Sequence, residues 1–466
     1  MTARVGAIVG RHLIYRTLSA GACFAGCLLP AAVQGNETEI AYGFSQSFES
    51  SDNLGLDPIS LGSTTFASTG LTFGLLRETP LDRFGLTASG TLRAVNGPGA
   101  ESGLDDQRLE LSYDREGARS AFGINASYLQ SDIEFLRPLE DFENDEGEIE
   151  LPSDLDDLNG TGTRESYRTG FTLELGQDEP VGAAFSGEYL ALRYSDTSNS
   201  SLSDNDRSNL DADLFLRFTP LVTGTLGAAY QVYDAEDEEQ TRRETNTGYF
   251  GLNFEVSPIL RLETQLGYTT IDTREFGTVT QTQGPSGLLR LERDMPNGIV
   301  SAEIEQIVTE DGDIRNFLAG RSLDLPSGSF AVALGVADTD AGGSDFIGSL
   351  DWSQELASGA MSARLDRSLR FDEENGNTLR TALFFDYAHD INSVSAIGLN
   401  AGYTISDKTG GKTDIGDFTV SYRHALTRDW GLDLGYRYRL REELEEPRAQ
   451  SHSVFFTMRR DLVFRP

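Results

Sequence analysis

The chain has 466 residues, of which 38% are hydrophobic and 9% aromatic, and its formal net charge is −36. This apolar content excludes a disordered chain, and the large negative charge excludes nucleic acid as a partner. Beyond the N-terminal segment, no stretch of roughly ten residues repeats its apolar positions with the period of a helix, so helical layers are not expected.

The N-terminal segment has the features of a secretory signal. Arg4, Arg11 and Arg16 precede the apolar run "TLSAGACFAGCLLPAA", which is too short to span a bilayer. We therefore expect a signal peptide over residues 1–35. The tetrapeptide "FAGC" fits a lipoprotein signal poorly, because apolar sequence continues past Cys27. Both cysteines lie in this run, so the mature chain offers no disulfide, thiol nucleophile or Cys-metal site.

From residue 36 to residue 466 one unit recurs, an alternating run of about nine to eleven residues followed by a connection. The connections alternate between tight ones, such as "SPI" (257–259), and longer acidic ones, such as "DAEDEEQTRRE". This pattern predicts about 22 strands, within a range of 18–24. The first is expected near 38–48 and the last near 452–464. With an even count, both termini of the chain lie on the same side of the barrel.

Three features indicate that the apolar faces of these strands contact lipid rather than a protein core. The strands have the length that a tilted strand needs to cross a bilayer. Aromatic residues gather near the two ends of the strands, for example Phe84 and Trp430 at the tight turns and Tyr167 and Tyr268 at the other rim. The polar faces carry charge along their whole length, which is costly in lipid. A secreted β-sandwich or solenoid is the alternative.

We therefore expect an all-β fold, a single closed antiparallel transmembrane β-barrel in the bacterial outer membrane. Its short turns face the periplasm and its long acidic loops face outward.

One long connection stands apart. Residues 132–157, "DIEFLRPLEDFENDEGEIELPSDLDD", alternate acids with apolar side chains. Long loops in compact proteins tend to be functional, and we expect the 131–163 loop to fold over or into the mouth as a constriction. Its candidate residues are Asp141, Glu143, Asp145, Glu146, Asp154, Asp156 and Asp157. A solvated surface loop is one alternative. Weak binding of Ca²⁺ or Mg²⁺, shared with lipopolysaccharide phosphates, is another; no other cofactor is expected.

The strand faces opposite the apolar ones predict a charged lumen. The expected pore-lining residues are Arg93, Arg168, Glu174, Asp211, Asp213, Arg217, Arg261, Glu263, Glu303, Glu305, Arg380, Asp386, Asp433, Arg437 and Arg439. One hypothesis is that they pair across strands and hold the wall in register. The other is that they tune permeation, and the two are compatible.

Two positions in the C-terminal half need separate comment. Arg321 shares a face with Phe317 and Leu323, and the pattern offers no reason for a charge there. His452 lies between Ser451 and Ser453 and is the only candidate for a hydrolytic site. A lone histidine beside serine is common on polar surfaces, so we expect no enzyme activity.

The opening strand "EIAYGFSQSFESSDN", the loop "LDPISLGST" and the closing "SVFFTMRRDLVFRP" resemble the β-barrel porin type 2-like bacterial outer-membrane proteins. The resemblance covers the mature chain and implies a pore-like outer-membrane protein, in a group with some members associated with exopolysaccharide export. It supplies no catalytic or binding residue.

The sequence leaves three functions open: a passive porin-like channel for small hydrophilic solutes, a component of exopolysaccharide export with a periplasmic partner, and a structural surface barrel. A TonB-dependent transporter needs a plug in a barrel this wide, and the first strand follows the predicted signal too closely to leave room for one. The expected partners are outer-membrane lipid, lipopolysaccharide and the barrel-assembly machinery.

Overall fold

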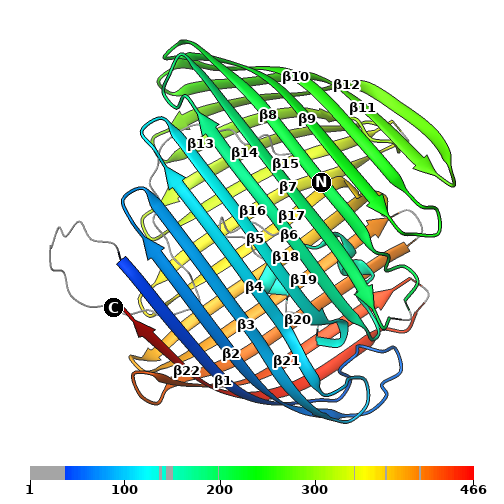
Figure 1. The fold of residues 1–466 in the computed structure, drawn as a ribbon, viewed down its shortest axis with the longest axis vertical. Helices are drawn as coiled ribbons and strands as arrows, with labels where there is room; N and C mark the ends of the chain where they lie inside the picture. The colour runs from blue at the N-terminus through cyan, green and yellow to red at the C-terminus, as the bar shows by residue number, and fades with distance from the viewer. Residues whose placement is uncertain are drawn as a thin grey trace.

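The computed structural model describes residues 37–135, 139–142, 151–197, 199–340, 342–372, 375–408, 411–444 and 446–466. Their strands form one closed antiparallel sheet of 22 strands, drawn in Figure 1. The predicted fold and strand count are confirmed. The predicted signal peptide over residues 1–35 lies outside the described residues. No described helix is long and apolar enough to cross a bilayer.

The strands follow one another along the chain and around the barrel. They are β1 (Glu37–Ser51), β2 (Thr64–Glu78), β3 (Asp82–Asn96), β4 (Gly103–Glu116), β5 (Ser120–Asp132), β6 (Thr163–Leu175), β7 (Val181–Ser195), β8 (Asn205–Thr219), β9 (Val222–Ala235), β10 (Arg242–Ser257), β11 (Leu260–Glu275), β12 (Thr278–Met295), β13 (Gly298–Ile307), β14 (Ile314–Leu325), β15 (Gly328–Thr339), β16 (Gly343–Leu356), β17 (Gly359–Asp372), β18 (Gly376–Asn392), β19 (Ser395–Lys408), β20 (Gly411–Ala425), β21 (Trp430–Glu443) and β22 (Ala449–Phe464). The described part of the β5–β6 loop holds three short 3-10 helices, η1 (Ile133–Phe135), η2 (Leu139–Phe142) and η3 (Ser153–Asp156).

The barrel closes where its first and last strands meet. β1 pairs with β2 on one side and with β22 on the other, from Ile40 opposite Phe464 to Ser51 opposite Ser453. This pairing leaves no sheet edge. Closure is required in a bilayer, because an unpaired backbone N–H or C=O in hydrocarbon costs several kcal/mol.

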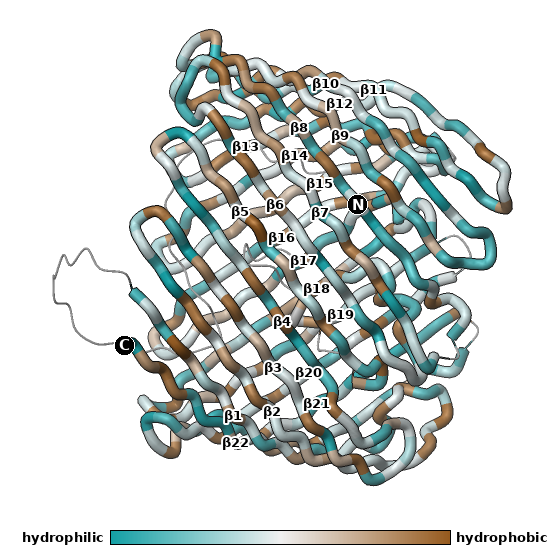
Figure 2. Tube along the Cα trace, in the orientation of Figure 1, coloured by the Kyte–Doolittle hydropathy of each residue, from teal (hydrophilic) through white to brown (hydrophobic). Residues whose placement is uncertain are grey.

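Figure 2 shows hydrophilic and hydrophobic residues interleaved along the strands. Because successive strand residues point to opposite faces, this alternation separates an apolar outer face from a charged inner one. On β21, Leu434 and Tyr436 are exposed on the outer surface. On the opposite face of the same strand, Asp433 pairs with Arg459 of β22 and Arg437 pairs with Glu49 of β1. An apolar exterior around a polar interior is the arrangement of a transmembrane barrel.

Aromatic side chains meet near both rims. Near the tight turns, the Tyr42 ring centroid lies 5.5 Å from that of Phe73 and 6.0 Å from that of Phe464. Near the long loops, Tyr128 and Tyr167 lie 4.9 Å apart by ring centroids. Amphipathic rings prefer the lipid–water interface, so these contacts are consistent with the two expected girdles.

All strands but β13 are longer than the predicted nine to eleven residues; β13 has 10 and the longest, β12, has 18. The extra length lies toward the long loops, where outward-facing ion pairs such as Arg242–Asp234 and Arg315–Asp338 continue the ladders. Charges on the outer face are costly in lipid, so these strand ends stand in water above the apolar belt. Backbone pairing between strands continues beyond the bilayer. The sequence pattern of alternating apolar residues does not reveal this extension, because both faces of the strands are polar there.

Arg321, which the sequence pattern left unexplained, lies on the outer face opposite Val300. Its Nη2 donates to Oδ1 of Asn297, 2.6 Å away in the β12–β13 turn. The long side chain therefore carries its charge to the rim while its stem stays on the apolar wall.

Candidate functional site in the barrel lumen

The described parts of the β5–β6 loop fold into the barrel instead of standing in solvent (Figure 1). Leu139 and Leu155, exposed by only 2% and 0%, form a buried cluster with Ala382 and Phe384 of β18 and Ile415 of β20. These three wall residues share the inner face, and strands β1–β4 and β22 separate β5 from β21 around the ring. The loop therefore crosses the lumen to a distant part of the wall. Burial of each leucine contributes about 1.5–3 kcal/mol.

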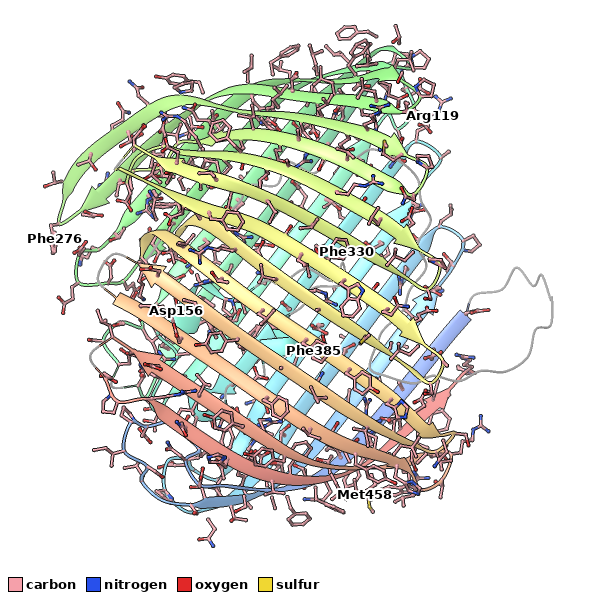
Figure 3. All side chains as sticks on the ribbon, turned by 180° about the vertical axis from the view of Figure 1, so that it is seen from behind. Arg119, Asp156, Phe276, Phe330, Phe385 and Met458 are labelled. Atoms are coloured by element: carbon pink, nitrogen blue, oxygen red, sulfur yellow. The ribbon has the colours of Figure 1, made fainter. Side chains whose placement is uncertain are left out.

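Basic side chains of that wall bind the acidic end of the loop. Arg380 Nη2 lies 3.4 Å from Asp156 Oδ2, and Lys408 Nζ lies 3.5 Å from Asp157 Oδ2. Arg441, nearly buried, donates to the carbonyl oxygens of Leu158, at 3.2 Å, and of Asp156. Figure 3 shows Asp156 against strands that lie far from it in sequence. The loop is thus fixed by charge as well as by apolar contact.

The near side of the loop is held by Asp154. Its carboxylate accepts hydrogen bonds from Arg164 Nη2 of β6 at 3.0 Å and from the Tyr194 hydroxyl at 2.5 Å. Burial alone raises the pKa of Asp154, but the adjacent Arg164 guanidinium and these hydrogen bonds outweigh burial and lower the pKa. The loop therefore carries this charge inside the barrel in a paired state.

The start of the loop packs on a third part of the wall. The Arg93 guanidinium lies over the Phe135 ring, 3.7 Å from its centroid, and Phe66 meets the same ring at 5.2 Å. Beside them Glu134 has a buried Oε2 with no hydrogen-bond partner among the described residues. Burial, with the nearby charge of Asp132, raises the pKa of Glu134 to about 7. Its ionisation therefore opposes docking of the loop.

A second loop, residues 308–313, also turns inward and was not predicted. Glu310 pairs with the nearly buried Arg243 of β10 and accepts a hydrogen bond from Thr273. Asp311 accepts the backbone N–H of Asn377 at 3.0 Å. Two loops from different parts of the ring therefore contribute residues to the lumen.

The predicted pore-lining residues do not converge on one cluster but pair with nearby side chains, most of them on the adjacent strand or the next strand but one. Arg290 bridges Glu263 at 3.6 Å and Glu303 at 2.7 Å. Of the other predicted residues, these have the following partners: Arg93 with Asp105, Arg168 with Glu188, Arg261 with Asp294, Asp433 with Arg459, Arg437 with Glu49, Glu305 with Asn316, Asp386 with Asn400, Asp213 with Tyr249 and Glu174 with Gln177.

Three further predicted residues contact backbone or the loop. Arg217 donates to the Gly176 and Glu179 carbonyls, Arg439 to the Leu54 carbonyl, and Arg380 to Asp156. The remaining one, Asp211, lies on the inner face opposite Ser186 of β7. This geometry fits the hypothesis of pairing that holds the wall in register.

Of the predicted constriction residues, Asp154, Asp156 and Asp157 contact the wall as described above. Glu143, Asp145 and Glu146 lie outside the described residues, and only the backbone of Asp141 is described. Sequence reasoning missed Lys408 and Arg441. The signal for Arg441 was present, since it continues the inward alternation of Arg437 and Arg439.

The one candidate hydrolytic arrangement does not form. Ser451 and Ser453 are buried on the inner face, whereas His452 lies on the outer face, where its Nδ1 is 2.7 Å from the Tyr436 hydroxyl. Consecutive residues of a strand point to opposite faces, which separates the histidine from both serines. Among the described residues no group of three or more His, Cys, Asp or Glu side chains is placed to hold a metal ion.

Solved structures of bacterial transporters and receptors have the same fold. The FrpB iron transporter from Neisseria meningitidis (F5-1 variant) matches with a TM-score of 0.59 and 9% identity, over 92% of this chain and 83% of that one. The copper transporter OprC matches at 0.55 and 10%, over 93% and 81%. BauA, the ferric preacinetobactin receptor from Acinetobacter baumannii, matches at 0.53 and 10%, over 92% and 80%. At such identities the likeness establishes the fold alone, and it confirms the predicted outer-membrane β-barrel.

No family model matches the chain, and no curated protein matches it in sequence. The narrower resemblance to the porin type 2-like proteins is therefore not supported by these comparisons and stays a prediction.

Proposed function

We propose that this protein is an outer-membrane pore for small hydrophilic solutes, narrowed by the β5–β6 loop. The observation that carries the proposal is the contact of Leu139 and Leu155 with the inner wall of β18 and β20, across the lumen from the strands that the loop connects. A loop held there reduces the cross-section that a solute meets. The proposal assigns no catalytic step to the chain.

The charges around the loop suggest how such a pore would select. Arg380, Lys408 and Arg441 are engaged by the loop. Loop carboxylates compensate the charges of Arg380 and Lys408, and Glu443 pairs with Arg441. An excess of acidic over basic residues, 74 against 38, characterises the chain as a whole. Rings of acidic side chains favour cations in pores. We therefore expect weak cation preference.

The experiment is single-channel recording of the refolded protein in a planar bilayer with a salt gradient. The full chain is compared with a variant in which residues 136–150 are replaced by a short Gly-Ser linker. The proposal predicts stable steps that lean toward cations, and larger steps in the variant. A folded barrel that is silent in both forms would overturn it.

A second candidate is selective uptake of a metal ion or metal chelate, as the names of the iron and copper transporters and of the ferric preacinetobactin receptor state for those proteins. It is favoured by the shared barrel fold together with a lumen occupied by two loops. This candidate predicts a silent full-length barrel that binds a ferric chelate, measured by titration calorimetry. Binding without conductance would select it over the diffusion pore.

Export of exopolysaccharide with a periplasmic partner, and a structural surface barrel, remain predictions. Neither gains support from the structural neighbours. Binding of lipopolysaccharide and of the barrel-assembly machinery likewise remains a prediction.

A further inference from the structure

One arginine faces the lipid side of the barrel at the seam where the barrel closes. Arg460 of β22 is opposite Phe44 of β1 and opposite Trp430 of β21, and Phe44 is exposed on the outer face. Residues opposite one another in a ladder share a face, so Arg460 faces outward. It stands between Met458 and Leu462 in the alternation of this strand, where the pattern calls for an apolar side chain.

No carboxylate of the described residues forms an ion pair with Arg460. Its guanidinium carbon lies 5.4 Å from the Trp430 ring centroid, and its Nε is buried without a hydrogen-bond partner among the described residues. Arg321, another outward-facing arginine discussed above, also has no carboxylate partner among the described residues, but its Nη2 donates a hydrogen bond to Asn297 in the turn. An uncompensated guanidinium on a lipid-facing wall is costly unless an anion meets it.

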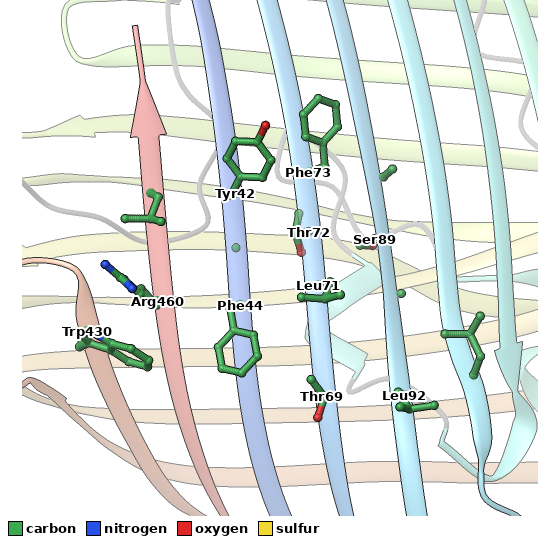
Figure 4. Close-up of a pocket in the computed structure, with 15 residues that line it drawn as sticks. Tyr42, Phe44, Thr69, Leu71, Thr72, Phe73, Ser89, Leu92, Trp430 and Arg460 are labelled. Carbon is green, nitrogen blue, oxygen red and sulfur yellow. The ribbon is translucent and has the colours of Figure 1, made fainter.

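An apolar groove of about 710 Å³ begins beside this arginine and runs across β1, β2 and β3. Figure 4 shows Arg460 next to Trp430 at one side of the groove, with Tyr42, Phe44, Leu71 and Phe73 along it. The β3–β4 ladder shifts register between Ser89 and Thr91, and Gly90 lies at that shift without a side chain to fill the space. A bulge with a glycine thus hollows the outer wall at this point.

We propose that this groove binds one acyl chain of an anionic phospholipid whose phosphate is held by Arg460. Charge complementarity supplies the argument, because the planar guanidinium suits bidentate binding of phosphate oxygens. Trp430 is the first residue of β21 after the 426–429 turn, so the arginine lies toward the rim of tight turns. Short turns of outer-membrane barrels face the periplasm, which places the site in the phospholipid leaflet. The proposal does not depend on the function of the lumen.

Native mass spectrometry of the full-length protein, extracted from outer membranes in mild detergent, tests this site. The wild type should retain one phospholipid, and added phosphatidylglycerol should replace it in preference to phosphatidylcholine. Arg460→Gln should reduce the fraction with bound phosphatidylglycerol roughly tenfold, the loss expected for one charge-assisted hydrogen bond. The matched control Arg321→Gln, which alters another outward-facing arginine, should leave that fraction unchanged.

A second variant tests the groove separately from the charge. A Cβ at Gly90 meets only the Leu104 Cδ1, at 3.7 Å, so Gly90→Leu fits the fold while filling the groove. It should abolish retention of the lipid although Arg460 is intact. Heat-modifiable migration on electrophoresis verifies that each variant is a folded barrel. Equal retention by wild type, Arg460→Gln and Gly90→Leu, or no lipid on the folded wild type, would overturn the proposal.

Discussion

At the scale of single residues, Leu155 links the fold of the acidic loop to its position in the lumen. Its side chain has no exposed surface and clusters with Phe384 and Ile415 of the wall. Leu155→Ala should weaken docking of the loop by about 2–5 kcal/mol, the cost of a buried leucine truncation. Proteolysis of the loop in the refolded barrel measures this effect. Leu266→Ala, on the exposed outer face, is the matched control, and equal proteolysis of both variants would contradict the assignment.

Glu134 gives docking of the loop a pH dependence. Burial raises its pKa from 4.5 to about 7 when the loop is docked. The docked state then binds more protons than the undocked state between these values, so docking weakens as pH rises through this window. Glu134→Gln should reduce the dependence and favour docking above neutral pH. Channel noise recorded between about pH 5 and pH 8 checks the prediction, and an identical pH profile for both proteins would reject it.

At the scale of elements, the ladder across β11, β12 and β13 places one cation between two acids. Arg290 contacts both Glu263 and Glu303, and each of the three side chains is more than half buried. Arg290→Gln leaves two facing carboxylates without a cation. We expect a stability loss of about 1 kcal/mol and a stronger cation preference.

The reversal potential under a salt gradient measures the change in selectivity. Arg315→Gln is the control, because the Arg315–Asp338 pair faces outward above the apolar belt. An equal shift in both variants would mean that the β11–β13 ladder does not line the conducting path.

Strands and their faces were predictable because alternation is a local property. Each of the runs behind β8 and β21 shows it within its own residues, and the register of a barrel follows from it. The inward fold of the 131–163 loop was also foreseeable, since its apolar residues need a surface to bury against. Its partners were not. Asp156 and Arg441 lie 285 residues apart, and only the closed ring brings them together. The 308–313 loop gave no signal, because it is short and its partner Arg243 lies on β10, three strands away from β13.

At the scale of the whole molecule, closure of the barrel brings residues from distant strands together in one cross-section of the lumen. The β5–β6 loop contacts β2, β3, β6, β7, β18, β19, β20 and β21, and the 308–313 loop contacts β10, β11 and β18. Because β18 meets both loops, a change on that strand is expected to affect both. The width of the path through the lumen is therefore set by loop docking rather than by strand number alone.

A cross-lumen disulfide tests this directly. A Cβ at Gly402 of β19 lies 2.9 Å from the Leu139 Cβ, and a small relaxation brings the pair to disulfide distance. Both native cysteines, Cys23 and Cys27, precede the described residues, so the double variant Leu139→Cys/Gly402→Cys carries its only barrel thiols at this contact. Oxidation should form the bond in high yield and give steps of one size with little noise.

Reduction of the same molecules should restore the fluctuations of an unlocked loop, and the single variant Leu139→Cys should respond to neither treatment. The comparison distinguishes where the loop lies from whether the loop limits permeation. If the bond forms but conductance is the same in both redox states, the loop is docked as described yet does not limit permeation. If the bond does not form in the folded barrel, the loop does not cross the lumen, and the constriction is rejected along with its contacts to Arg380 and Arg441.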